Sequence, residues 1–158
     1  MSDAPIIEDL VGNAHGNLDR VKEILEAHPQ LLEARAPWNE TPIEAATQTG
    51  ARPIIEYLLE LGAPLDFFTA CVLARRDLVE RELAANPARA TENGVHGIPA
   101  LHFAILGGDA EIVRLLVENG ADPARPVDEA GTLPAQLARN RGRHDLAKII
   151  EGRAQELH

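Results

Sequence analysis

Apolar residues along this chain recur at the spacing of an amphipathic helix. In one clear case Ile112, Val113 and Leu116 would share one helical face, while charged residues fill the opposite face. A shorter helical segment, residues 99–107, precedes this helix and is separated from it by Gly108. The pattern predicts a pair of helices joined by a glycine turn, and similar pairs recur along the chain.

The glycine of this turn marks a repeat. Equivalent positions are occupied by Gly16, Gly50, Ala74, Gly108 and Gly142, at intervals of 34, 24, 34 and 34 residues. Positions 58 residues apart also match, which indicates a duplicated two-repeat unit followed by a fifth repeat. We therefore predict one domain of five helix pairs, with repeats covering approximately residues 1–36, 37–64, 65–93, 94–126 and 127–158.

Two short motifs give these helix pairs a family resemblance. Thr41-Pro42 and Leu101-His102-Phe103-Ala104 each match half of the T-P-L-H-x-A signature. With a period near 33, the chain resembles the ankyrin repeat family, in particular the small free-standing ankyrin proteins found in bacteria. The resemblance implies an all-α solenoid whose stacked helix pairs share one core. It also implies that His102 hydrogen-bonds between repeats and that partner proteins bind a concave face built from first helices and hairpin fingers.

One hairpin finger of this arrangement is missing. Fingers are expected near residues 34–40, 91–98 and 124–132, but too few residues separate the second repeat from the third. There Asp66 is placed to cap the next helix. Phe67 and Phe68 either fill the space that a finger would cover or are simply two core aromatics.

Composition and charge exclude several classes of function. With a net charge of −10 and five aromatic residues, the chain lacks the basic surface and stacking residues of a nucleic-acid-binding protein. We expect no membrane span and no signal peptide, and hence a soluble cytoplasmic protein. Residues 1–66 carry twelve acidic and four Lys or Arg side chains, a net charge of −8. This excess could attract a basic partner, although solubility alone would also explain it.

No catalytic or metal-binding constellation emerges from the sequence. No two of the six histidines have the i, i+4 spacing of a helical zinc site, and a single cysteine cannot build a cysteine-rich one. Cys71 is expected to be a buried small hydrophobic residue, and the nearby Arg75 and Arg76 leave a reactive thiol as the enzymatic alternative. We predict no enzyme activity, no cofactor and no metal.

Position by position, the family resemblance implies a set of candidate protein-binding residues. They are Trp38, Glu40, Gln48, Thr49, Val72, Leu73, Val95, His96, Ile98, Leu106, Glu129, Thr132, Asn140 and Arg141. Trp38 is the only tryptophan and falls at a finger tip, where it is either a binding hot spot or a lid over neighbouring prolines. If exposed together, Val72, Leu73 and Leu106 would form an apolar strip suited to a partner or to self-association.

The sequence thus predicts a protein–protein interaction module. Its preorganised surface would lose little entropy when a partner binds. Two alternatives stay open at this point. The chain could be a self-associating structural protein, or it could be an inhibitory or accessory subunit of an enzyme.

Overall fold

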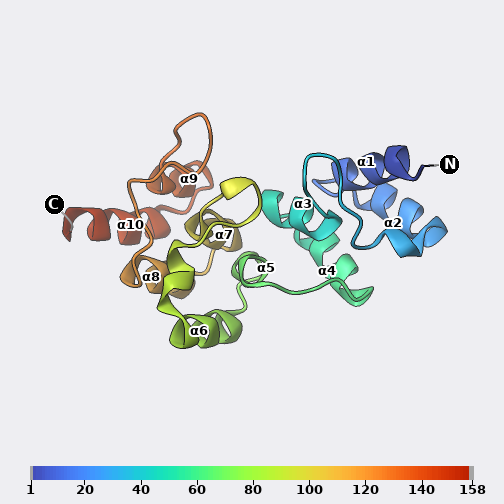
Figure 1. The fold of residues 1–158 in the computed structure, drawn as a ribbon. Coiled ribbons are helices and arrows are strands. Elements are labelled where there is room, and N and C mark those ends of the chain that lie inside the picture. Colours follow the sequence, from blue (N-terminus) through green and yellow to red (C-terminus); the bar gives the residue numbers. More distant parts are fainter. Residues whose placement is uncertain (1, 157–158) are drawn as a thin grey trace. The chain divides into compact units, whose positions relative to one another are not determined.

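A computed structural model describes residues 2–156 of the chain (Figure 1). Within that range the regular elements are helices, and β-structure is limited to isolated bridges. The α-helices are α1 (Ala4–Asn13), α2 (Leu18–Ala27), α3 (Pro42–Thr49), α4 (Arg52–Glu60), α5 (Phe67–Val72), α6 (Arg76–Ala85), α7 (Ala100–Gly107), α8 (Ala110–Glu118), α9 (Pro134–Asn140) and α10 (His144–Glu156). Three short 3-10 helices are η1 (Pro29–Leu31), η2 (Pro87–Thr91) and η3 (Val95–Gly97). The predicted all-α fold of helix pairs is confirmed.

The chain divides into two compact units between Thr69 and Ala70, within α5. In the first unit α1 packs against α2 and α3, and α4 packs against α2 and α3. In the second unit α7 packs against α8 and α9, while α8 packs against α6 and α10. Within each unit, first helices of successive pairs are therefore neighbours, and so are second helices, as in stacked repeats. The predicted repeat boundaries, which include residues 1 and 157–158 outside the described range, stay predictions.

A left-handed residue closes the turn between the two helices in four of the five described pairs. Gly50, Gly108 and Gly142 have φ angles of 70°, 76° and 73°, and Ala74 has a φ of 56° at the same position. Glycine suits this turn because it has no Cβ to clash in the left-handed region. The first pair differs, since Gly16 is not among the residues with positive φ and α1 is followed by Ala14 in the right-handed region.

Hydrogen bonds link residues one repeat apart. The Thr49 hydroxyl donates to the carbonyl oxygen of His15 at 2.7 Å, and the Arg143 guanidinium donates to the carbonyl oxygen of Gly108 at 2.7 Å. Arg76 pairs with Asp109, which also caps the N-terminus of α8. Burial would raise the pKa of Asp109, but the Ile112 N–H and the Arg76 guanidinium outweigh this effect and lower it.

Three finger hairpins occur where the sequence predicts them. Isolated bridges join Ala36 to Glu40 and Asn93 to Pro99, and the Val127 N–H donates to the carbonyl oxygen of Thr132. Residues 62–66 form no such hairpin and lead directly into α5.

The expected cap of α5 is confirmed. The Asp66 carboxylate accepts the Thr69 N–H at 2.8 Å. Phe67 is 3% exposed, and Phe68 is half-buried with its ring edge-to-face against that of Phe67. Phe67 therefore behaves as a core residue.

Candidate protein-binding surface

The first finger presents a large aromatic ring at its tip. Asn39 adopts a φ of 63°, the left-handed conformation that asparagine tolerates better than most residues, and so turns the chain where a glycine would otherwise be needed. The neighbouring Trp38 is 41% exposed, which is unusual for a tryptophan. An accessible indole is what the hot-spot interpretation of Trp38 requires.

Glu40 does not lie on the surface, and its assignment as a contact residue is wrong. Its side chain is fully buried and its carboxylate Oε1 accepts a hydrogen bond from the Trp38 indole Nε1 at 2.8 Å. The same oxygen lies 3.1 Å from Nε2 of His15. A buried carboxylate is stable only with such partners, so Glu40 supports the finger from within. Sequence reasoning missed His15 as part of this cluster.

The end of α3 offers one accessible candidate in the first unit. Thr49 is exposed, although its hydroxyl already donates to the His15 carbonyl oxygen. Gln48 is half-buried. Both remain candidate contacts at the end of α3.

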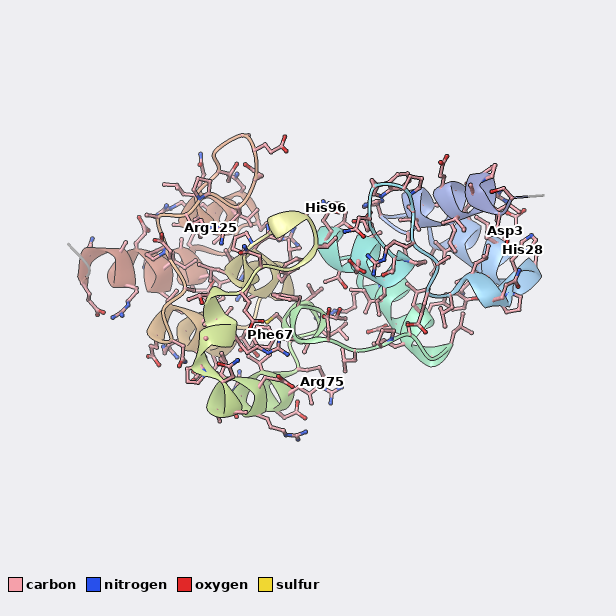
Figure 2. The ribbon with its side chains drawn as sticks, in the orientation of Figure 1. Asp3, His28, Phe67, Arg75, His96 and Arg125 are labelled. Atoms are coloured by element: carbon pink, nitrogen blue, oxygen red, sulfur yellow. The ribbon has the colours of Figure 1, made fainter. Side chains whose placement is uncertain are left out.

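The second finger belongs to the second unit and is built around η3. His96 at its tip is exposed and has a φ of 56° (Figure 2), while Val95 and Ile98 are half-buried. The Arg125 guanidinium donates to the carbonyl oxygen of Gly97 at 3.0 Å and to the side chain of Asn93. Arg125 therefore ties this finger to the loop that follows α8.

The third finger is stabilised by its own polar groups. The Thr132 N–H donates to the Asp128 carboxylate at 3.0 Å, and this bond lowers the pKa of Asp128. Glu129 at the tip is exposed and Thr132 is half-buried. The turn contains Gly131 with a φ of 84°. Glu129 is therefore an accessible candidate contact at the tip of this finger.

The predicted apolar strip is not an exposed surface. Val72 is 2% exposed, and Leu73 and Leu106 are half-buried. The cause is a close backbone approach within the second unit, where the end of α7 meets the last turn of α5. A Cβ built on Gly107 would lie 2.1 Å from the carbonyl oxygen of Cys71. Val72 is therefore a core residue, and its assignment as a contact residue is wrong.

Asn140 and Arg141 are both exposed at the end of α9. Asn140 also lines a shallow groove of about 510 Å³ between α9 and α10. Beside it, Arg139 pairs with Glu151. One repeat earlier, the corresponding positions are the buried Ile105 and Val117. The ion pair makes this face polar where the preceding repeat is apolar, which is typical of a capping repeat.

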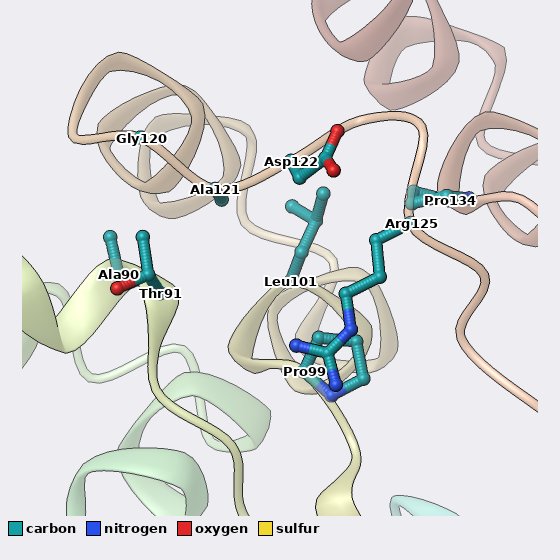
Figure 3. Close-up of a pocket in the computed structure, with 9 residues that line it drawn as sticks. All are labelled: Ala90, Thr91, Pro99, Leu101, Gly120, Ala121, Asp122, Arg125 and Pro134. Carbon is teal, nitrogen blue, oxygen red and sulfur yellow. The ribbon is translucent and has the colours of Figure 1, made fainter.

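A small cavity in the second unit lies beside the N-terminal end of α7 (Figure 3). Its walls are mostly small or apolar groups, with Asp122 and Arg125 among them. Its volume is about 70 Å³. Small-molecule sites usually measure about 300–1,000 Å³, so this cavity is far smaller than a typical ligand pocket.

In the part of the chain that the structure describes, neither a metal-binding cluster nor a membrane-spanning helix is found. Over residues 2–156 no three His, Cys, Asp or Glu side chains are placed to share a metal ion. In the same range no helix combines the length and apolar character needed to cross a bilayer. The His102 ring packs edge-to-face on Phe103, with ring centroids 5.3 Å apart, and its role between repeats stays a prediction.

Cys71 is fully buried, and the labelling rate of its thiol tests this burial. Because a buried thiol reacts only when the structure opens, we expect a thiol-specific reagent to label the native protein more than about a hundredfold more slowly than the chain in denaturant. The rates are measured by absorbance with a chromogenic disulfide. Fast stoichiometric labelling of the native protein would instead support the enzymatic alternative.

Comparison with known proteins agrees with this architecture. Residues 96–127 match the ankyrin repeat family. The packed helix pairs described above are consistent with an ankyrin solenoid. A segment of 54 residues is 44% identical to human protein phosphatase 1 regulatory subunit 27, and it covers 34% of each chain. Another 109 residues, 69% of this chain, are 29% identical to mouse ankyrin repeat and SAM domain-containing protein 6.

These similarities cover only parts of the relatives. The chain spans about a third of the length of the phosphatase regulatory subunit and 10% of the SAM domain-containing protein.

Proposed function

We propose that the chain is a non-catalytic interaction module that binds a partner protein through its finger tips and the ends of its first helices. The observation that carries the proposal is the pair of exposed rings at matched tips, Trp38 and His96, which lie 58 residues apart in the sequence. Neither ring is needed to fill a core. Tryptophan is enriched at binding hot spots, and hairpins with fixed left-handed turns reduce the entropy lost on binding.

The charge of the first unit favours a basic partner. Its twelve acidic and four Lys or Arg side chains give it most of the net charge of the molecule. Such an excess accelerates association with a positively charged surface and makes that association sensitive to salt. We therefore expect capture of the partner to weaken as the salt concentration rises.

The proposal is tested by capturing partners from a lysate of the source organism with the wild type and with the Trp38→Ala, His96→Ala double variant. We expect the double variant to lose at least about thirtyfold in affinity, since a hot-spot residue contributes about 2 kcal/mol or more. Leu61→Ala is the matched control, because Leu61 is 47% exposed but lies at the end of α4 rather than on a finger. A partner held equally by wild type and double variant would contradict the proposal.

A narrower form of this function is an accessory subunit of a phosphatase. The similarity to a protein phosphatase 1 regulatory subunit favours it over other enzyme partners. Purified protein phosphatase 1 catalytic subunit added to the same capture assay tests this form directly. Retention of the phosphatase by the wild type and its loss from the double variant would support it, and no retention would reject it.

Other features of the function rest on the sequence alone. Self-association has weaker support than the sequence suggested, because Val72 is buried. Light scattering over a range of concentrations tests it. A bacterial source and a cytoplasmic location stay predictions, and the relatives named above are mammalian.

A further inference from the structure

An arginine from the loop after α8 clamps the second finger. Nη1 of Arg125 donates to the side-chain oxygen of Asn93, and its Nη2 donates to the carbonyl oxygen of Gly97 at 3.0 Å. An isolated bridge joins Asn93 to Pro99 at the base of the finger. Gly97 directly follows His96 at the tip. Figure 3 shows the Arg125 side chain extending from its loop to Pro99. One planar guanidinium therefore holds the base and the tip of the finger together.

The first finger has an arginine at the same carbonyl group. Asn39 and Gly97 lie 58 residues apart and are both left-handed, with φ angles of 63° and 72°. Nη1 of Arg35 donates to the carbonyl oxygen of Asn39 at 3.3 Å and to its side-chain oxygen at 3.2 Å. In both fingers an arginine thus binds the carbonyl oxygen of the left-handed residue that follows the ring at the tip.

The two arginines reach this carbonyl group from different parts of the chain. Arg35 lies within the first finger, whereas the equivalent position in the second finger is Asn93, a residue that Arg125 binds. The position equivalent to Arg125 is the buried Phe67, which follows a segment without a finger. The clamp of the first finger is therefore local, whereas the clamp of the second finger joins it to the loop of the next repeat.

The backbone at the tip of the second finger explains why a clamp matters there. His96 has a φ of 56°, and the next residue, Gly97, also lies in the left-handed region. A residue with a Cβ rarely adopts this conformation, which persists only where the surrounding structure holds it. Hydrogen bonds from a charged guanidinium are stronger than those between neutral groups, so Arg125 is well suited to hold this turn.

We propose that Arg125 is a positioning residue that fixes the His96 ring in its presented orientation and joins the second finger to the loop that leads into the third. The two fingers of the second unit therefore meet a partner as one preorganised surface, which reduces the entropy lost on binding. The first finger is held separately by its own Arg35. This inference rests on the proposed function, because it concerns how His96 is offered to a partner.

The test uses backbone order parameters from ¹⁵N relaxation, which need no partner. A rigid amide has an order parameter of about 0.85, and a flexible one falls below about 0.6. We expect the amides of His96 and residue 125 to be rigid in the wild type and flexible in Arg125→Ala, while Leu116 of α8 stays rigid in both. Arg114→Ala is the matched control, because Arg114 pairs with Glu111 of its own helix and should leave His96 rigid.

Moving the arginine separates the clamp from the coupling between fingers. In the double variant Asn93→Arg, Arg125→Ala, the introduced guanidinium stands where that of Arg35 stands in the first finger. Asn93 is exposed, so the larger side chain can be accommodated. The order parameter of His96 should return to about 0.85, whereas that of residue 125 should stay below about 0.6.

Circular dichroism verifies that each variant is folded. A His96 amide that stays rigid in Arg125→Ala would overturn the proposal, and so would a His96 amide that stays flexible in the double variant. A loss of order that extends to Leu116 would also overturn it, because the effect would not be local to the finger. Partner capture is measured separately, so failure of the proposed function is distinguishable from failure of this inference.

Discussion

Replacing Gly107 by alanine should destabilise the second unit by about 3 kcal/mol or more, a large effect for one methyl group. The added Cβ would lie 2.1 Å from the carbonyl oxygen of Cys71 and 3.0 Å from that of Val72. Both atoms belong to the backbone, so no flexible side chain can move aside. We expect the midpoint of thermal unfolding, followed by circular dichroism, to fall by roughly 6–12 °C.

Labelling of the Cys71 thiol provides a second measurement of the destabilisation caused by Gly107→Ala. Its carbonyl is the group that the new methyl would displace, so the labelling rate of the Cys71 thiol should rise in Gly107→Ala. Gly152→Ala is the matched control, because Gly152 lies within α10 with open space around its Cβ position. There alanine should stabilise the helix by about 0.5–1 kcal/mol. Equal stability of Gly107→Ala and the wild type would show that α5 and α7 do not approach this closely.

Gly107 also shows where the sequence was informative and where it was not. The repeated glycine marker predicted the turn at Gly108, whose φ of 76° confirms it. The sequence placed Gly107 only at the end of the preceding helical segment, whereas its role is to admit the α5 backbone, a contact made 36 residues away. Helical periodicity and turn chemistry act locally and can be read from the chain, whereas a close approach between distant segments cannot.

In the candidate site, too, the sequence predicts local features but not contacts between distant segments. Fingers and their tips follow from the repeat register, and the structure shows Trp38 and His96 exposed at these tips. Glu40 was misplaced because an acidic residue at a finger is usually solvated, and nothing local indicates that His15 lies opposite it. The signal that could have found this pair is the joint change to Leu73 and Ile98 in the duplicated unit.

Truncation of Phe103 should also cause a large loss in the free energy of unfolding. Phe103 is fully buried in α7 and is among the largest buried side chains of the described residues. Phe103→Ala removes its packing and leaves a cavity, so we expect a loss of about 3–5 kcal/mol in the free energy of unfolding. Phe103→Leu retains most of the volume and should lose about 1 kcal/mol. Urea unfolding followed by circular dichroism gives both values.

The two probes of the chain show where the Phe103 effect is felt. Cys71 lies in the same unit as Phe103, whereas Trp38 lies in the other unit. Each repeat of a solenoid contacts only its neighbours. Phe103→Ala should therefore lower the stability reported by Cys71 labelling more than the stability reported by the urea midpoint of Trp38 emission. If Trp38 emission and Cys71 labelling report the same loss in the free energy of unfolding, the chain unfolds as one cooperative body. A loss below about 1 kcal/mol in Phe103→Ala would contradict the placement of Phe103 in the core.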